Sequence, residues 1–342
     1  MMKNRFFCLL VAAALLLSGC TIRPSQAVPA DTASATESAS VSQTESVTGA
    51  EITTESRAEP ETTTFPETET ASETGLPAFP ETLSLGSGQA FAYDVTAGAY
   101  LAMKGEGERL YPASTTKLLT ILTALRYLSP DELVTPGDEL TMVLSDSTFA
   151  YVNSTHTLTV EMLIEGMLLP SGNDAACALA AAAGRTISGD STLSGVDSVA
   201  VFVQEMNRYA QEIGMTGSHF VTPDGYFDED HYTTVEDMAK VSLLAAQNDL
   251  IRRYCGLAQA DVVYASGHTN HWVNTNLMLD PSSVWYNPYV TGLKTGSVSG
   301  HCSLICILDK DGREYIAGVF SAPDTTTRYT DMTAIANWLL AD

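Results

Sequence analysis

Basic residues are scarce in this sequence. Its 342 residues include 17 Lys and Arg against 41 Asp and Glu, which gives a formal net charge of −24. The chain therefore lacks the positive footprint that nucleic-acid binding requires, and we expect no nucleic-acid partner. Much of the negative charge lies in residues 21–82. The acidity therefore describes that segment more than any binding face.

Long apolar runs are missing after residue 20, where no stretch approaches the ~20 residues that a membrane-spanning helix needs. The first twenty residues, MMKNRFFCLLVAAALLLSGC, have the charged start and short apolar run of a secretory signal. Their end, LSGC, resembles a bacterial lipobox, in which Cys20 is acylated; the alternative is an ordinary signal peptide that happens to contain a cysteine. We expect a secreted protein, held by a lipid on Cys20 at the outer face of the bacterial cell membrane.

Aliphatic and aromatic residues are almost absent from residues 21–82, where Ser, Thr, Glu, Pro and Ala predominate. Such a segment cannot bury enough apolar surface to fold. It predicts a disordered tether between a signal peptide at residues 1–20 and a folded domain at residues 83–342. The sequence is 45 % hydrophobic, which is enough to give that domain a core.

Cysteines are also few. Two of the six lie in the predicted signal and lipobox, which leaves Cys177, Cys255, Cys302 and Cys306 for the folded domain. Cys302 and Cys306 fall in a predicted strand, where four residues span about 13 Å, too far for a mutual disulfide. Cys177 lies in an alanine-rich predicted helix and fits a small core residue. We therefore expect four buried or free thiols.

The folded part changes its pattern twice along the chain. Residues 89–104 predict a β-hairpin around a Thr-Ala-Gly turn. Helical periodicity dominates residues 114–249, within segments 159–168, 174–183, 199–213 and 235–247. Three strands are predicted at residues 289–296, 301–309 and 313–320, and an amphipathic helix at 331–341. Strands at both ends of a helical middle predict one α+β domain, with an antiparallel sheet built from both ends of the domain.

Ser114 and Lys117 stand three residues apart where a hydrophobic helix is predicted to begin, in YPASTTKLLTIL. At this spacing they share one face, and Ser114 lies in the first turn, where free N–H groups favour developing negative charge. A neutral lysine beside a serine can act as its general base, and burial or a second cation makes the amine neutral. The alternative is an N-capping serine and a solvated lysine.

Two further patterns present polar side chains from a turn and a strand edge. Ser171 and Asn173, in LLPSGNDAA, precede an alanine-rich helix that either residue could simply cap. Lys294-Thr295-Gly296 puts a glycine in a predicted strand, which indicates an edge that another segment approaches closely. Such an edge would suit a carboxylate, and the alternative is a bulge with a solvated lysine.

The order Ser-x-x-Lys, Ser-x-Asn, Lys-Thr-Gly is the signature of active-site serine enzymes that bind penicillin. The segments YPASTTKLLT, LLPSGNDAA, GMTGSHFVTPDG, HYTTVEDMA, NTNLML and GLKTG resemble, in order, those of the low-molecular-mass penicillin-binding proteins, the serine-type D-alanyl-D-alanine carboxypeptidases. The resemblance covers nearly the whole folded part. It implies a β-lactamase/transpeptidase-like fold, removal of the last D-alanine from peptidoglycan stem peptides that end in D-Ala-D-Ala, and covalent inhibition by β-lactam antibiotics.

The resemblance also implies roles for the residues that would carry the chemistry. Ser114 would attack the peptide carbonyl and form an acyl-enzyme, with Lys117 as the base for that attack. Ser171 would relay a proton to the departing amine, and Asn173 would hold the substrate amide.

The remaining motif residues would bind the substrate. Lys294 and Thr295 would hold the terminal carboxylate, and Lys294 would help to keep Lys117 neutral. Gly296 belongs to the same binding edge. The backbone N–H of Ser297 would complete the oxyanion hole with that of the nucleophile.

The sequence departs from the family in several places. Many relatives carry an aromatic residue or a histidine at the position of Ser297, and Asp224, Tyr226 and Phe227 depart from the usual Pro-His-Gly-Leu-like run. Many relatives also continue into a β-rich domain and an amphipathic membrane helix, whereas this sequence stops after one predicted helix. We expect the N-terminal lipid to take over the attachment to the membrane.

Two other functions stay open. A class A serine β-lactamase would need a glutamate that positions a deacylating water, for which Glu205 and Glu212 are the candidates. An inactive cell-wall-binding lipoprotein could keep the fold without the activity. His268 and His271 could suggest a metal pair, but no acidic or cysteine partner follows at a helpful spacing, so we expect no metal and no cofactor.

Overall fold

The computed structural model describes residues 75–341. The predicted signal peptide, Cys20 and most of the predicted tether lie outside these residues. Contacts with the domain begin at Pro77, whose carbonyl accepts a hydrogen bond from the Met103 amide at 2.7 Å. Phe79 packs edge-on against Trp338, with the ring centroids 5.7 Å apart. The last residues before position 83 therefore lie against the domain.

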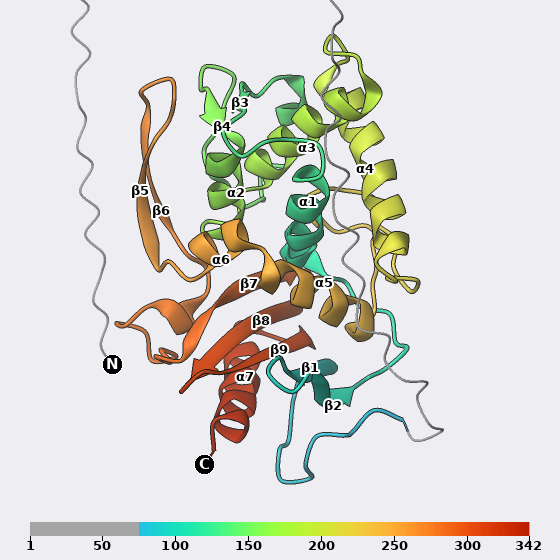
Figure 1. Cartoon of the computed structure of the whole chain (residues 1–342), viewed down its shortest axis with the longest axis vertical. Coiled ribbons are helices and arrows are strands. Elements are labelled where there is room, and N and C mark those ends of the chain that lie inside the picture. The colour runs from blue at the N-terminus through green and yellow to red at the C-terminus, as the bar shows by residue number, and fades with distance from the viewer. Residues whose placement is uncertain (1–74, 342) are drawn as a thin grey trace, which may run out of the picture. The chain divides into compact units, whose positions relative to one another are not determined.

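Both ends of the described chain contribute to one five-stranded antiparallel sheet, in the order β2-β1-β9-β8-β7. Its strands are β1 (Gln89–Asp94), β2 (Ala99–Lys104), β7 (Val290–Val298), β8 (His301–Lys310) and β9 (Arg313–Ala322). Figure 1 shows the teal N-terminal hairpin beside the red C-terminal strands. The β1–β9 pairing joins the two ends, which confirms the predicted sheet.

The sheet separates two apolar cores because successive side chains of a strand point to opposite faces. On β8, Leu304, Cys306 and Leu308 belong to the core under α7 (Thr325–Leu339), and Ile305 and Ile307 belong to the core under the other helices. The alternation explains why β8 reads as an almost continuous apolar run, since both of its faces are covered.

The last helix, α7, packs on one face of the sheet (Figure 1). Its predicted apolar stripe of Met332, Ile335 and Leu339 is at most 7 % exposed, as expected. The helix starts at Thr325, ahead of the predicted 331, because the Asp324 carboxylate caps it by accepting a hydrogen bond from the Thr327 amide at 2.7 Å.

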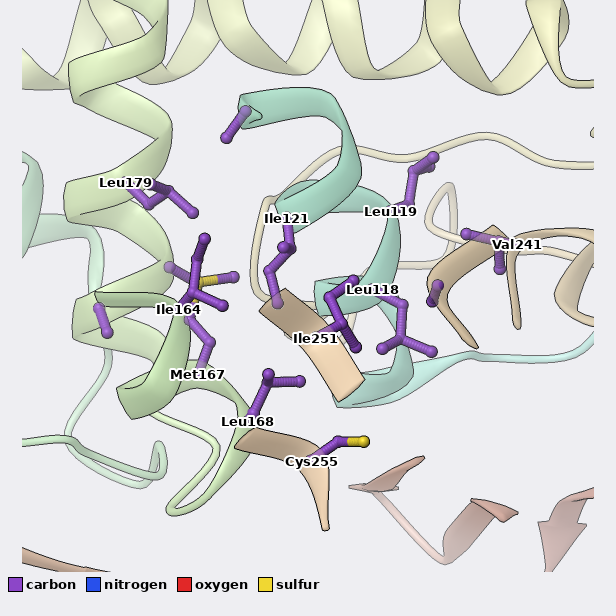
Figure 2. Close-up of a cluster of buried hydrophobic side chains, with 14 of the residues drawn as sticks. Leu118, Leu119, Ile121, Ile164, Met167, Leu168, Leu179, Val241, Ile251 and Cys255 are labelled. Carbon is purple, nitrogen blue, oxygen red and sulfur yellow. The ribbon is translucent and has the colours of Figure 1, made fainter. Parts of the chain in front are cut away.

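The opposite face of the sheet carries a layer of helices. They are α1 (Lys117–Ala124), α2 (Val160–Leu168), α3 (Asn173–Ser188), α4 (Gly195–Glu212), α5 (Val235–Gln247) and α6 (Asp249–Cys255). α1 lies in the middle of this layer and contacts α2, α3, α4 and α5. Figure 2 shows Leu118 and Ile121 of α1 surrounded by apolar side chains of neighbouring helices. Those side chains include Ile164, Leu179, Val241 and Ile251. This packing fixes the start of α1, where Lys117 lies.

Several short elements escaped the sequence analysis. The hairpin β5 (Gln259–Val263) and β6 (Thr269–Val273) lies beside the helical layer, and β3 (Leu133–Val134) pairs with β4 (Leu158–Thr159). Single turns of 3-10 helix lie at Ala113–Thr116, Asp138–Met142 and Leu277–Leu279. β5 and β6 have only five residues each and bury one residue each, so their signal in the sequence was weak.

Two further findings concern the described residues as a set. None of their helices is long and apolar enough to cross a membrane. The four cysteines of the domain are buried and free, which confirms the expectation of unpaired thiols.

Candidate active site

Ser114 lies in the 3-10 turn Ala113–Thr116 that leads directly into α1. Two glycines press on this turn from opposite sides. A Cβ on Gly225, whose φ is +79°, would lie 1.9 Å from the Ala113 carbonyl oxygen. A Cβ on Gly296 would lie 2.8 Å from the Pro112 carbonyl oxygen and 3.2 Å from the Ser114 nitrogen. The close approach predicted at the Lys-Thr-Gly strand is therefore the approach of the serine turn itself.

Lys117 has no exposed surface. Its Nζ lies 2.8 Å from Ser114 Oγ and donates hydrogen bonds to Asn173 Oδ1 at 2.7 Å and to the Asp224 carbonyl oxygen at 2.9 Å. The alternative of a capping serine with a solvated lysine is wrong, because the Ser114 side chain makes no capping bond and the lysine is buried. The spacing of three residues in a 3-10 turn stacks the two side chains directly.

Ser171 and Asn173 project from the turn before α3 into the same site. Ser171 has a positive φ of 64°, and Gly172 is the N-cap of the helix without any side-chain capping bond. Neither polar residue therefore serves as a helix cap. Instead, the Asn173 amide oxygen contacts Lys117, and Ser171 Oγ accepts a hydrogen bond from Lys294 Nζ at 2.8 Å.

Lys294 and Thr295 lie on β7, the edge strand of the sheet. Lys294 is 1 % exposed and also donates to the Thr295 carbonyl at 3.1 Å. Thr295 Oγ1 lies 2.6 Å from Thr275 Oγ1. The solvated lysine that the sequence left open is wrong, since Lys294 points inward to Ser171.

Two buried amines in one site disfavour each other's positive charge. Burial lowers the pKa of Lys117 to about 8, and the negative charge of Asp224 opposes part of that shift. Burial also lowers the pKa of Lys294 well below its usual range, and the charges of Lys117 and Arg328 add to the effect. We assign the neutral amine that matters for chemistry to Lys117, because its Nζ is the one that contacts Ser114 Oγ, at 2.8 Å. A neutral Lys117 can donate to Asn173 and Asp224 and direct its lone pair at the Ser114 O–H.

Arg328, on α7, is a residue of this site that the sequence analysis missed. It is 6 % exposed and lines the same cleft as Ser114. Its Nη1 donates to the Gly296 carbonyl at 3.2 Å and to Ser297 Oγ at 3.1 Å, and its Nε has no partner among the described residues. A basic residue is uncommon in this sequence, but nothing in the segment DTTTRYTD ties Arg328 to a strand that ends 30 residues earlier.

The site opens into a cleft of about 410 Å³. Its lining includes residues of β7, Arg328, the segment at 146–148, Tyr226 and Phe227. Ser297, an exposed residue of β7, lies on the rim. The three sequence motifs therefore meet at one cleft, although they come from separate parts of the chain.

Other candidates from the sequence lie elsewhere. Glu205 and Glu212 are on α4, where both pair with Arg208, and neither lines the cleft. His271 pairs with Asp261 on the β5–β6 hairpin. Within residues 75–341, no three His, Cys, Asp or Glu side chains are grouped as a metal site.

The sequence matches the family model of peptidase family S11, D-alanyl-D-alanine carboxypeptidase, over residues 77–324. The chain belongs to this family. This match confirms the resemblance inferred from the motifs. The matched region contains every residue that lines the cleft except Arg328, which lies in the first turn of α7.

Individual relatives agree with the family assignment. The D-alanyl-D-alanine carboxypeptidase DacF of Bacillus subtilis (strain 168) is 28 % identical over 247 residues, which cover 70 % of this chain and 59 % of DacF. The D-alanyl-D-alanine carboxypeptidase of Streptomyces sp. (strain K15) is 29 % identical over 261 residues, covering 70 % of this chain and 86 % of that protein. This chain therefore matches less than two thirds of the length of DacF.

Solved structures show the same architecture. The crystal structure of the Streptomyces K15 DD-transpeptidase has a TM-score of 0.67 and 26 % identity to this chain, and the match covers 76 % of this chain and 98 % of the other. The predicted β-lactamase/transpeptidase-like α+β fold is confirmed.

Proposed function

We propose that this protein is a serine D-alanyl-D-alanine carboxypeptidase that removes the terminal D-alanine of peptidoglycan stem peptides through an acyl-enzyme on Ser114. The observation that carries the proposal is that two serines lining one cleft, Ser114 and Ser171, each contact a buried lysine. Lys117 Nζ lies 2.8 Å from Ser114 Oγ, and Lys294 Nζ lies 2.8 Å from Ser171 Oγ. Family membership supports the same reaction, since the family is described by it.

In the acylation step, the neutral Lys117 amine takes the proton of Ser114 as Oγ attacks the carbonyl between the two D-alanines. The developing oxyanion accepts hydrogen bonds from the backbone N–H groups of Ser114 and Ser297. The amine of the leaving D-alanine receives a proton through Ser171, which Lys294 holds in place by its 2.8 Å hydrogen bond. Water then hydrolyses the ester and releases the shortened peptide.

The substrate is oriented by polar groups on both sides of the serine. Asn173 is positioned to hold the backbone amide of the acyl part. The terminal carboxylate is bound by Thr295 and Lys294, and its negative charge favours the protonated form of that buried amine. Gly296 lines the cleft at the same edge of β7. We add Arg328 to this carboxylate site, because its positively charged guanidinium lines the cleft beside Gly296 and Ser297.

A β-lactam presents a reactive carbonyl and a carboxylate in similar positions, and it acylates the same serine. Deacylation should be slow, because the class A candidates Glu205 and Glu212 lie outside the cleft. Slow deacylation makes the β-lactam an inhibitor of this chain and argues against β-lactamase activity.

Transfer to an amine is a second candidate reaction. The similar Streptomyces K15 protein is named a carboxypeptidase in one description and a DD-transpeptidase in another. Hydrolysis and transfer share the acyl-enzyme and differ in whether water or an amine attacks it. D-Alanine leaves in both reactions, so the ratio of shortened peptide to transfer product, measured in the presence of an amine acceptor such as glycine, decides between them.

The test of the proposed function is the release of D-alanine from diacetyl-L-Lys-D-Ala-D-Ala by the full chain. We expect release that depends on Ser114 and is lost in Ser114→Ala. Penicillin turned over repeatedly would favour the β-lactamase, and acylation by penicillin without D-alanine release would favour an inactive binding protein.

The proposal includes attachment to the membrane through a signal peptide at 1–20, a lipid on Cys20 and a tether at 21–82, with the catalytic domain at 83–342. The long polar tether would let that domain reach the peptidoglycan from the outer face of the membrane. The chain expressed with its own signal in a bacterium should incorporate labelled palmitate and partition with membranes, and Cys20→Ser should do neither. Recovery of the unchanged chain as a soluble, unlipidated protein would overturn this part.

A further inference from the structure

The cleft is lined by side chains of opposite charge. Arg328 contributes positive charge beside Gly296 and Ser297 of β7. Asp146 contributes an exposed carboxylate to the same cleft. The positive side is accounted for by the terminal carboxylate of the proposed substrate, whereas the carboxylate of Asp146 has no role in the mechanism described above.

The Asp146 carboxylate is held by the hydroxyl of Tyr226, another lining residue of the cleft. The Tyr226 O–H lies 3.0 Å from Asp146 Oδ1 and 3.1 Å from Oδ2. One hydroxyl uses one of about four acceptor positions of a carboxylate. Within residues 75–341, no Lys, Arg or His pairs with Asp146, so its negative charge is left without a cation.

The segment around Asp146 is hydrogen-bonded to Ser171 and Asn173. Thr148 Oγ1 donates to the Ser171 carbonyl at 2.6 Å, and the Asn173 amide donates to the Thr148 carbonyl at 2.9 Å. These bonds keep the segment in register with two residues that contact substrate in the proposed mechanism. The position of the Asp146 carboxylate relative to the acyl site is therefore set by the fold.

Tyr226 is fixed from the other side. Its amide donates to Asp224 Oδ1 at 3.0 Å, and the preceding Gly225 packs against the Ala113 carbonyl of the serine turn. Tyr226 therefore follows a residue that packs on the serine turn, and its hydroxyl contacts Asp146.

We propose that Asp146 and the Tyr226 hydroxyl form a subsite for an ammonium group on the acyl part of the substrate, namely the side-chain amine of the residue that precedes the two D-alanines. The substrate identity rests on the proposed function. Arg328 and Lys294 take the carboxylate end of the peptide, so the Asp146 carboxylate is left to bind a positive side chain on the acyl end. The Tyr226 hydroxyl keeps the carboxylate turned into the cleft.

The direct experiment compares two peptides that differ only in this charge. They are Nα-acetyl-L-Lys-D-Ala-D-Ala, with a free ε-amine, and the same peptide acetylated on that amine. For the full chain we expect kcat/KM of D-alanine release to be about fivefold higher for the free amine, the size typical of a partly exposed ion pair. The preference should shrink as the salt concentration rises.

Variants separate charge from structure. Asp146→Asn keeps an acceptor for Tyr226 and removes the charge, and the ratio of the two kcat/KM values should fall to about one. Asp146→Glu restores the charge and should recover part of the preference, whereas a merely structural role would be served better by Asn. Asp131→Asn, at an exposed position outside the cleft, is the matched control and should keep the ratio of the unmodified chain. An absent preference in the unmodified chain, or one that survives in Asp146→Asn, would overturn the subsite.

A second pair of probes does not depend on carboxypeptidase activity. Ampicillin differs from benzylpenicillin by an amine on the acyl side chain, and at pH about 6 that amine is an ammonium. Asp146→Asn should slow acylation of Ser114 by ampicillin relative to benzylpenicillin by a similar factor. This result without any D-alanine release would support the subsite and refute the proposed function. Release of D-alanine with a ratio of drugs unaffected by Asp146 would do the reverse, and no acylation by either drug would overturn both.

Discussion

Lys117 Nζ lies 2.8 Å from Ser114 Oγ, at the end of a side chain that has no exposed surface. The two residues are three apart in a single turn, so the chain itself brings them together, and the helices packed around α1 exclude water from the lysine. Ser114 is left half-buried at the floor of the cleft. The proposed acylation depends on this arrangement, in which the base Lys117 is shielded from water and the nucleophile Ser114 is open to substrate.

Removal of the base should abolish acylation while the fold survives. General-base catalysis contributes ~10²–10⁴-fold to a rate, so Lys117→Ala should slow covalent labelling by a fluorescent penicillin by at least that range. Lys240→Ala is the control, because it makes the same substitution on α5 at a lysine that is one third exposed and lies outside the cleft. It should leave the labelling rate unchanged. Circular dichroism should show the folded domain in both variants. Retained labelling in Lys117→Ala would refute the assignment of the base.

The rate of acylation should rise with pH through about 8. Below that value Lys117 holds its proton and cannot accept that of Ser114, since its pKa is about 8. The Asp224 carboxylate raises the pKa of Lys117, so Asp224→Asn should move the midpoint of the profile to lower pH. The Asn side chain can still accept the hydrogen bond of the Tyr226 amide, which leaves the local structure in place. A midpoint that stays fixed or moves upward would contradict this electrostatic role.

Two glycines with the same backbone conformation offer a matched comparison. Gly225 has a φ of +79° and Gly214 a φ of +80°, but a Cβ would lie 1.9 Å from the Ala113 oxygen in the first case and no closer than 3.9 Å to anything in the second. Both Gly→Ala variants should lose about 1 kcal/mol of stability to the unfavourable φ. Only Gly225→Ala should also displace the serine turn, with a loss of acylation of up to ~10²-fold. Penicillin labelling and urea unfolding separate the two effects, and equal labelling in the two variants would count against the packing role.

His231 should make the domain sensitive to acid. It is 2 % exposed, its Nε2 lies 2.9 Å from Thr116 Oγ1, and burial lowers its pKa to about 4. Between pH 6.5 and 4, His231 binds a proton in the unfolded chain but not in the folded chain. The free energy of unfolding therefore falls as the pH drops, by up to about 3 kcal/mol.

The measurement for His231 is urea unfolding across that pH range. His231→Gln should show a flatter dependence of the unfolding free energy on pH than the unmodified chain. His219→Gln, at an exposed histidine nearby, should leave the dependence unchanged. An identical slope in the unmodified chain and in His231→Gln would show that other groups cause the acid sensitivity.

The sequence predicted the fold class and the proximity of Ser114 and Lys117, because both depend on local patterns. The periodicity of residues 174–183 and the apolar stripe of α7 each arise from residues that are close together in the sequence. Ser114 and Lys117 are likewise neighbours in one turn, and the three motifs keep a fixed order that points to a family.

The remainder of the site depends on contacts between distant segments. Arg328 reaches Gly296 only because α7 packs back on the sheet, and Tyr226 meets Asp146 across 80 residues of chain. No spacing or periodicity connects such pairs. The carbonyl of Asp224 that receives Lys117 is also invisible in a sequence, since every residue has one.

The most direct test of the central claim is intact-mass spectrometry of the full chain incubated with benzylpenicillin, followed by peptide mapping of the adduct. The account predicts one long-lived penicilloyl adduct on Ser114, which is absent in Ser114→Ala. An adduct on any other residue, or drug that is consumed without an adduct, would contradict it.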